Sequence, residues 1–217
     1  MPATTTVGGQ KVGSVGYGLM GTIHAGLSER HGSLQPGLTW HNAAASDEKK
    51  FAAMRASLDA GCNYWNGGIF YGPLEDNSLV LLSKYYAKYP EDAKKVVLNI
   101  KGGIENMTPN STPAFMRAEI ESCLKTLGGK GKIDQYECAR RDPKVPLKES
   151  LGALAEMVKE GKIGGVALSE VNANTIKEAA AITKIVAVEV ELSLWATEPL
   201  TNGIAKVCAE KGIAIIA

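Results

Sequence analysis

The sequence predicts an α/β fold, a (β/α)8 barrel of the TIM type that is incomplete in this chain. After an N-terminal hairpin, about seven predicted strands alternate with six predicted helices, and such alternation produces parallel strands joined by right-handed crossovers. Polar residues gather at the carboxyl ends of several strands, and no strand leads into a GxGxxG helix start. Both observations favour a barrel over the alternative, an open doubly wound sheet.

The length of the chain limits how much of the barrel it can form. A complete barrel of this type has about 250 residues, whereas this chain has 217. We therefore expect the seventh helix, the eighth strand and the eighth helix to be missing, and residues 1–217 to form a single incomplete domain.

The predicted elements of the first half rest on local signals. Gly8-Gly9 suits a tight hairpin turn, and Ser46 before two acidic residues suits a helix start. Residues 96–100 form a nearly continuous apolar run, which indicates a strand covered on both faces. The predicted elements are a hairpin at 7–12, a strand at 14–21, a helix at 46–60, a strand and loop at 61–72, a helix at 76–89 and a strand at 96–100.

The second half continues the alternation. Pro113 suits the first turn of a helix, where its missing N–H does no harm, and Asn172 or Asn174 can cap a later one. The predicted elements are helices at 112–127, 146–159, 172–182 and 199–211, and strands at 133–139, 163–168, 185–191 and 213–217.

Residues 22–45 break the pattern and are predicted to form an irregular inserted loop. All three histidines of the chain, His24, His31 and His41, lie in this segment. Their spacing matches no metal-ligand motif and no cysteine accompanies them, so we predict no metal site.

Composition excludes several classes of protein. The formal net charge is +1, with no lysine-rich run, which argues against a nucleic-acid or membrane-surface protein. No apolar stretch reaches the roughly 20 residues of a membrane span, and the N-terminus lacks the features of a signal peptide. The four cysteines are far apart, which fits a reducing compartment. We expect a cytoplasmic protein, and the sequence makes no prediction of its oligomeric state.

A tyrosine and a lysine stand at the ends of neighbouring predicted strands. Tyr71 follows the first of these strands, and Lys101 ends the next one before two glycines. Because an adjacent ammonium favours phenolate, we expect Lys101 to lower the pKa of Tyr71. Gln135 and Glu137 lie two residues apart on a later strand, on the same face as Ala139. Both should therefore point into the barrel, where they need partners or water.

Several motifs together resemble the aldo-keto reductase family, and within it the pyridoxal reductase-like branch. The resemblance covers nearly the whole chain except the irregular segment. Its motifs are Gly16-Tyr17-Gly18-Leu19-Met20-Gly21, Asn63-Tyr64-Trp65-Asn66, Phe70-Tyr71-Gly72, Ile100-Lys101-Gly102-Gly103, Cys138-Ala139-Arg140, Lys144-Val145-Pro146 and Gly165-Val166-Ala167-Leu168-Ser169-Glu170.

The resemblance implies catalytic roles for three residues. Tyr71 matches the tyrosine that protonates the substrate carbonyl, and Lys101 matches the lysine that lowers the pKa of that tyrosine. Asn66 occupies the position of the family's aspartate; it can accept a hydrogen bond from Lys101 but cannot neutralise it, which should favour phenolate further. Ala139 occupies the position of the family's histidine. Arg140 comes next but should point to the other side of the strand, so we assign it no role.

The resemblance also implies NADPH as cofactor. Ser169 and Glu170 match positions that bind the nicotinamide carboxamide, where the family has asparagine in place of Glu170. Glu189 stands where the family has glutamine. Gly21 ends a glycine-containing strand that allows close backbone approach to a ligand, although tight packing explains such glycines equally well. The family's nicotinamide-stacking tyrosine and its phosphate-binding loops would follow Ala217.

The function implied is NADPH-dependent reduction of an aldehyde, pyridoxal to pyridoxine above all, with a small-molecule substrate as partner. The alternative is a truncated, catalytically inactive relative that acts as a binding or remnant domain. An insert near residues 22–36 and an abrupt end at Ala217 would suit that alternative.

Overall fold

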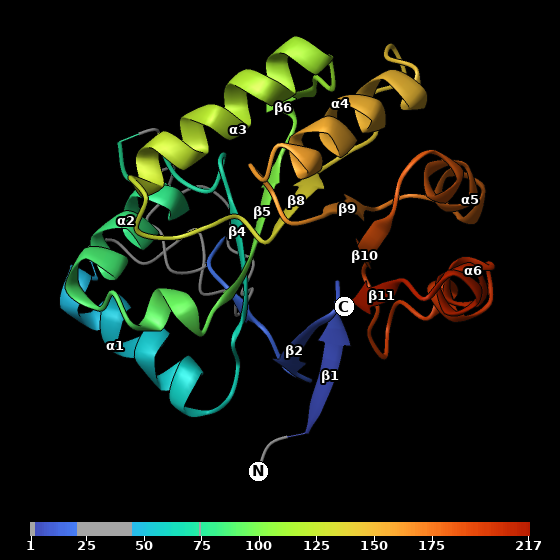
Figure 1. Ribbon diagram of the computed structural model, residues 1–217. Coiled ribbons are helices and arrows are strands. Elements are labelled where there is room, and N and C mark those ends of the chain that lie inside the picture. The colour runs from blue at the N-terminus through green and yellow to red at the C-terminus, as the bar shows by residue number, and fades with distance from the viewer. Residues whose placement is uncertain (1–2, 21–44, 74) are drawn as a thin grey trace, which may run out of the picture.

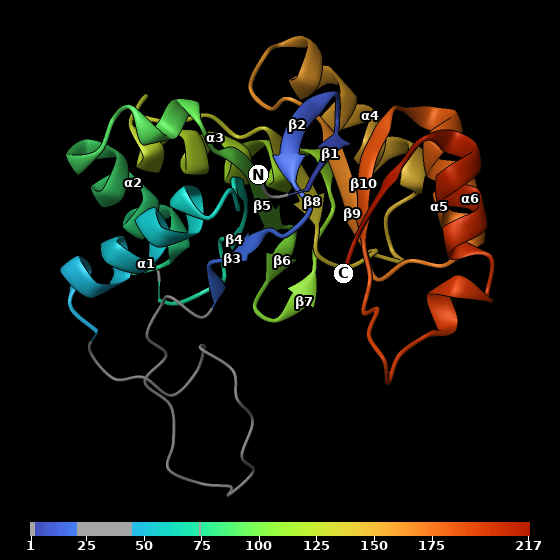
Figure 2. The same ribbon diagram turned by 90° about the horizontal axis from the view of Figure 1, so that it is seen from below.

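The protein is described here by a computed structural model, which defines residues 3–20, 45–73 and 75–217. Within these residues, seven parallel strands form one sheet in the order β11-β10-β9-β8-β5-β4-β3, and six helices surround it on the outside (Figures 1 and 2). The strands are β3 (Tyr17–Gly18), β4 (Tyr64–Gly68), β5 (Val97–Gly102), β8 (Gln135–Cys138), β9 (Val166–Ser169), β10 (Ile185–Glu189) and β11 (Ala214–Ile216). The helices are α1 (Asp47–Asp59), α2 (Ser78–Lys88), α3 (Pro113–Leu127), α4 (Leu147–Lys159), α5 (Ala173–Ile182) and α6 (Ile204–Lys211). The predicted incomplete (β/α)8 barrel is confirmed.

Local signals in the sequence set the ends of several helices. Asn77 caps α2 by accepting hydrogen bonds from Leu79 N and Val80 N, and Asn172 caps α5 by accepting one from Thr175 N. Pro113 lies in the first turn of α3, and Gly128 ends that helix at a φ of 59°. Of the two predicted caps for α5, Asn172 is therefore the one used.

Contacts between distant strands show that the sheet is strongly curled. Asn66 on β4 donates a hydrogen bond to Glu189 on β10, although β5, β8 and β9 lie between these strands in the sheet. Four strand spacings in a flat sheet would separate them by about 19 Å. The sheet must therefore bend around an interior into which both side chains point.

The barrel interior is layered, with apolar residues at the amino end and polar residues above them. Along β5, the inward-facing residues are Val97, then Asn99, then Lys101, all buried. Val97 belongs to an apolar cluster with the hairpin residues Val7 and Val12. The site is thus built on a packed apolar base.

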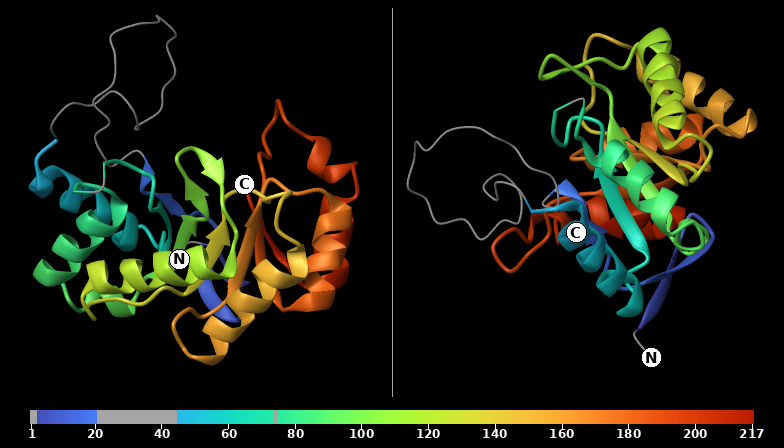
Figure 3. Two further views of the ribbon diagram at one scale, coloured as in Figure 1. Left: turned by 90° about the horizontal axis from the view of Figure 1, so that it is seen from above. Right: turned by 90° about the vertical axis from the view of Figure 1, so that its left-hand side faces the viewer.

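The predicted N-terminal hairpin is confirmed and closes the amino end of the barrel. Strands β1 (Thr4–Val7) and β2 (Gln10–Gly13) pair antiparallel, and Gln10 Nε2 donates to Asp134 Oδ1 at 2.8 Å. A second hairpin of β6 (Ile104–Glu105) and β7 (Thr108–Pro109) lies at the opposite end (Figure 3). The N-terminal hairpin thus leaves the carboxyl ends of the strands uncovered.

The structure departs from the predicted elements at two places. The strand expected at 14–21 pairs only at Tyr17 and Gly18, because its glycines favour sheet pairing weakly. The hairpin β6–β7 was not predicted, because its turn uses Asn106 and Met107 at φ 48° and 61° rather than the usual glycine. The predicted insert at 22–45 lies outside the described residues except for its last residue. None of the helices in the described ranges is long and apolar enough to cross a membrane.

Two glycine substitutions should have opposite effects on stability. A Cβ at Gly164 would lie 2.6 Å from the backbone oxygen of Asp134, whereas a Cβ at Gly152 in α4 meets nothing within 4 Å. We expect Gly164→Ala to lower the free energy of unfolding by about 1–3 kcal/mol. Gly152→Ala should raise it by about 0.5–1 kcal/mol through helix propensity. Urea denaturation of both variants tests this, and equal effects would contradict the close packing of Gly164.

Candidate active site

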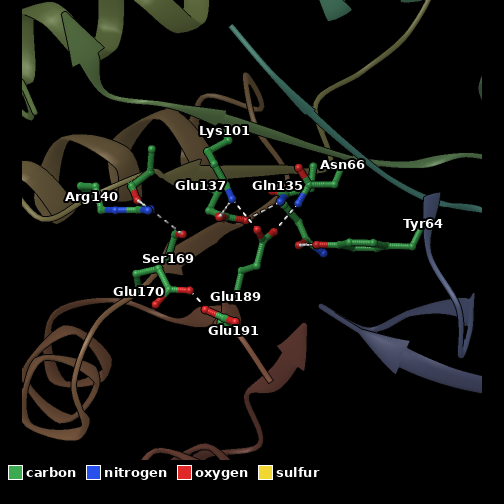
Figure 4. Close-up of polar contacts among 12 residues, drawn as sticks. Tyr64, Asn66, Lys101, Gln135, Glu137, Arg140, Ser169, Glu170, Glu189 and Glu191 are labelled. Carbon is green, nitrogen blue, oxygen red and sulfur yellow. Dashed lines mark hydrogen bonds and ion pairs between the residues drawn. The ribbon is translucent and has the colours of Figure 1, made fainter. Parts of the chain in front are cut away.

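A buried lysine lies at the centre of the polar layer. Lys101 pairs in register with Glu137 on the neighbouring strand β8, and its Nζ lies 3.1 Å from Glu137 Oε1. The same ammonium forms a closer ion pair with Glu189 Oε1, which reaches in from β10 (Figure 4). The side chain of Lys101 is only 8% exposed. Its charge is therefore balanced inside the barrel rather than by water.

Two side-chain amides hold these carboxylates in place. Asn66 Nδ2 donates to Glu189 Oε2 (Figure 4). Asn99 Nδ2 donates to Glu137 Oε2. We call Asn66, Glu189, Lys101, Glu137 and Asn99 the lysine network. It carries one positive and two negative formal charges when all three ionisable groups are charged, which is an unusual excess of negative charge for a buried cluster.

The prediction that Gln135 and Glu137 point into the barrel is confirmed. Both are buried, and each has a partner: Tyr64 OH donates to Gln135 Oε1 at 2.9 Å, and Glu137 belongs to the lysine network. Both side chains thus have polar partners in the interior, as burial requires, whereas Asn99 Oδ1 is buried without a hydrogen-bond partner among the described residues.

The network shifts the pKa values of its members. Burial raises the pKa of Glu137 to about 7, a shift that Lys101 opposes and Glu189 reinforces. Burial acts to lower the pKa of Lys101, but Glu137 and Glu189 outweigh it and the pKa is raised. Lys101 therefore stays charged, while Glu137 titrates near neutral pH.

Tyr71 follows β4 and lies against its end. Its backbone N donates to Gly68 O at 3.2 Å, and a Cβ at Gly68 would lie 2.8 Å from the tyrosine ring. The charge of Lys101 acts on the Tyr71 hydroxyl and favours its phenolate form. The structure thus brings together the tyrosine and lysine that the sequence predicted as a pair.

The predicted direction of the Tyr71 pKa is wrong. Burial raises the pKa of Tyr71 above its ordinary value, and the Glu189 and Glu137 carboxylates add to the rise. Lys101 does lower it, as expected, but this effect does not prevail. The main reason is the burial of the hydroxyl, to which the two glutamates add, and the sequence alone indicated neither.

Asn66 bonds to a glutamate in the structure. Its predicted ability to accept a hydrogen bond from Lys101 stays a prediction, while its amide Nδ2 donates to Glu189 Oε2. It therefore acts on the lysine through a carboxylate from the opposite wall of the barrel.

Of the predicted cofactor-binding residues, Glu189 belongs to the lysine network, and Ser169 and Glu170 follow at the carboxyl ends of the strands. Ser169 and Glu189 pair in register on β9 and β10, at the carboxyl end of the sheet. Glu170 follows with a φ of 52°, in the left-handed region that a side chain of this kind rarely adopts, and its Oε1 accepts from Glu191 N at 2.8 Å. Gly21 lies outside the described residues.

Arg140 lies nearer the site than strand alternation predicted. Strand β8 ends at Cys138, so the alternation no longer applies two residues later. Arg140 Nη1 donates to Ala139 O at 2.6 Å and to Ser169 Oγ at 3.3 Å (Figure 4). Arg140 is thus placed at the rim beside Ser169, while Ala139 is buried and offers no side-chain donor.

A cavity of about 750 Å³ opens beside the network. Its lining includes Tyr71, Asn66, Glu189 and Tyr64, together with residues of β3, β11 and the N-terminal hairpin. It is large enough for a small-molecule ligand next to the Tyr71 hydroxyl. The described ranges contain no group of three or more His, Cys, Asp or Glu that could hold a metal ion.

Comparison with known proteins identifies the family. The family model described as aldo/keto reductase matches residues 31–217. The chain belongs to the aldo/keto reductase family. A probable pyridoxal reductase 2 from Schizosaccharomyces pombe is 40% identical to this aldo/keto reductase over 97% of the chain and 60% of the relative. A putative pyridoxal reductase from Saccharomyces cerevisiae is 38% identical over 82% of the chain and 55% of the relative.

Solved structures agree on the fold. A glycerol dehydrogenase from Gluconobacter oxydans superposes with a TM-score of 0.79 over 99% of this chain and 62% of that one, at 19% identity. At this identity the likeness concerns the fold alone. This aldo/keto reductase chain spans 60% and 55% of the lengths of the two pyridoxal reductase relatives.

The raised pKa of Glu137 predicts how stability depends on pH. A carboxyl group whose pKa is raised on folding binds its proton more tightly in the folded protein than in the unfolded chain. The protonated Glu137 therefore contributes its full share to the free energy of unfolding below its ordinary pKa of 4.5. This share is lost as the pH rises through about 7. We expect the free energy of unfolding of the protein to fall across this window relative to Glu137→Gln, whose amide does not titrate.

Urea denaturation at several pH values measures the difference. Glu210→Gln on α6, an exposed site, controls for the loss of one charge. A difference between the protein and Glu137→Gln that stays constant from pH 4.5 to pH 7 would contradict the burial of an ionisable Glu137.

Proposed function

We propose that this chain carries the catalytic half of an NADPH-dependent reductase that converts a small aldehyde, pyridoxal in particular, to its alcohol. The observation that carries the proposal is the position of Tyr71, which interacts electrostatically with the buried Lys101 and lines a cavity of about 750 Å³. The names of the two yeast relatives support pyridoxal as the substrate.

Tyr71 is the proposed proton donor. Its raised pKa means that the phenol keeps its proton at neutral pH and can give it to the oxygen of a bound carbonyl. Lys101 then stabilises the phenolate that remains, because its ammonium is fixed beside the hydroxyl. The phenolate regains a proton from solvent through the open mouth, and Asn66 contributes by holding Glu189 on Lys101.

The residues at the rim fit the carboxamide end of the proposed cofactor. Each oxygen of Glu189 accepts one contact, from Lys101 or from Asn66, and a carboxylate offers about four lone-pair sites. Glu189 can therefore still accept from a carboxamide NH2 group, as Glu170 can, while Ser169 can donate its hydroxyl. When bound, NADPH would supply a hydride to the carbonyl carbon of the substrate. Gly21, outside the described residues, stays a predicted backbone contact.

A single substitution tests the proton donor. Tyr71→Phe removes the acidic proton but keeps the ring, so we expect pyridoxal-dependent NADPH oxidation to fall by about 10²–10⁴-fold. NADPH binding, followed by fluorescence titration, should be unchanged. Tyr89→Phe at the end of α2, away from the barrel mouth, is the matched control and should retain activity.

The outcomes separate the alternatives. Full activity in Tyr71→Phe would exclude Tyr71 as donor. If the chain itself does not bind NADPH, the reductase proposal fails for this chain, and the alternative of a catalytically inactive binding domain is favoured.

A further inference from the structure

The charge of Lys101 is balanced from the wall opposite β4. Glu189 Oε1 contacts the ammonium, and Glu189 Oε2 accepts from Asn66 Nδ2. The carboxylate of this hydrogen-bonded pair, Glu189, therefore lies on β10, and the amide, Asn66, lies on β4. We propose that Glu189 is the positioning residue that holds Lys101 beside Tyr71, and that position 66 requires an amide because it must donate to Glu189. This rests on the proposed function only in taking Tyr71 as the proton donor.

The contacts make the roles of the two residues distinct. Asn66 has an NH2 group directed at a carboxylate oxygen, which aspartate could not supply. An aspartate there would instead place a second carboxylate against Glu189, and like charges at hydrogen-bond distance repel strongly. Asn66 is thus suited to a site whose carboxylate comes from elsewhere.

Because these side chains are largely buried, their charges must be balanced by one another. The side chain of Lys101 is 8% exposed and that of Glu189 is 23% exposed, so solvent screens their attraction only weakly. Glu137, whose side chain is 1% exposed, already contacts the same ammonium from β8. A third carboxylate would leave the cluster with a further uncompensated negative charge, which the interior tolerates poorly.

The charged groups that act on Tyr71 come from three strands. Lys101 on β5 favours its phenolate form, whereas Glu189 on β10 and Glu137 on β8 favour its phenol form. Removing the charge of Glu189 should therefore make Tyr71 more acidic, because Lys101 becomes less neutralised. A residue with a purely structural role would not produce this change.

Exchange of the acid and the amide tests the proposal. The set comprises the protein, Asn66→Asp, Glu189→Gln and the double variant Asn66→Asp/Glu189→Gln. We expect Asn66→Asp alone to lower the urea midpoint of unfolding. The double variant should recover most of the loss, because the glutamine amide introduced on β10 can then donate to the new carboxylate on β4. The coupling between the substitutions should thus be favourable in a double-mutant cycle.

A spectroscopic readout makes the test specific to the site. Phenolate absorbance is titrated in each background and corrected with the matching Tyr71→Phe variant, which isolates Tyr71 from the other tyrosines. We expect the Tyr71 midpoint to move to lower pH in Glu189→Gln and to return toward its original value in the double variant. Glu178→Gln, on the exposed side of α5, should leave it unchanged.

Each outcome decides the matter. The proposal is overturned if Asn66→Asp alone is as stable as the protein, if the double variant recovers nothing, or if Glu189→Gln leaves the Tyr71 midpoint unmoved. If Asn66→Asp does not fold, folding of the double variant supports the proposal and its failure to fold overturns it. These measurements need neither NADPH nor substrate, so they stand apart from any failure of the reductase activity itself.

Discussion

One buried ammonium, held between carboxylates on two different strands, is the constraint on which the barrel mouth depends. Lys101 lies in register beside Glu137 and receives Glu189 from across the interior. Removing either carboxylate from water is costly, and the cost is offset only because each also accepts an amide hydrogen bond. The positions of Asn66 and Asn99 follow from that requirement.

This arrangement determines how Tyr71 can act as a proton donor. Burial of the Tyr71 hydroxyl, together with the Glu189 and Glu137 carboxylates, outweighs the effect of Lys101 and leaves the phenol protonated at rest. The ammonium nevertheless remains beside the hydroxyl when negative charge develops there. Tyr71 thus keeps its proton until a substrate oxygen takes it, and the lysine stabilises what is left.

The fold could be predicted from sequence because its signals are local. Asn172, Pro113 and Gly128 end or begin helices through their own chemistry, and strand alternation correctly placed Glu137 inside. The partners of Glu137 and Glu189 could not be predicted, because they depend on how far the sheet curls. The burial of the Tyr71 hydroxyl, which raises its pKa most, depends on the same curl, so the pKa of Tyr71 was predicted in the wrong direction. Arg140 was misplaced for a simpler reason, since its strand ends earlier than expected.

The curl of the sheet has one more consequence. Asn66 and Glu189 meet only because β4 and β10 face each other across the interior, so their hydrogen bond breaks if the sheet flattens. Glu189 would then withdraw from Lys101, and the acidity of Tyr71 would change with it. The titration of Tyr71 is therefore tied to the curl of the sheet through the contact between Asn66 and Glu189.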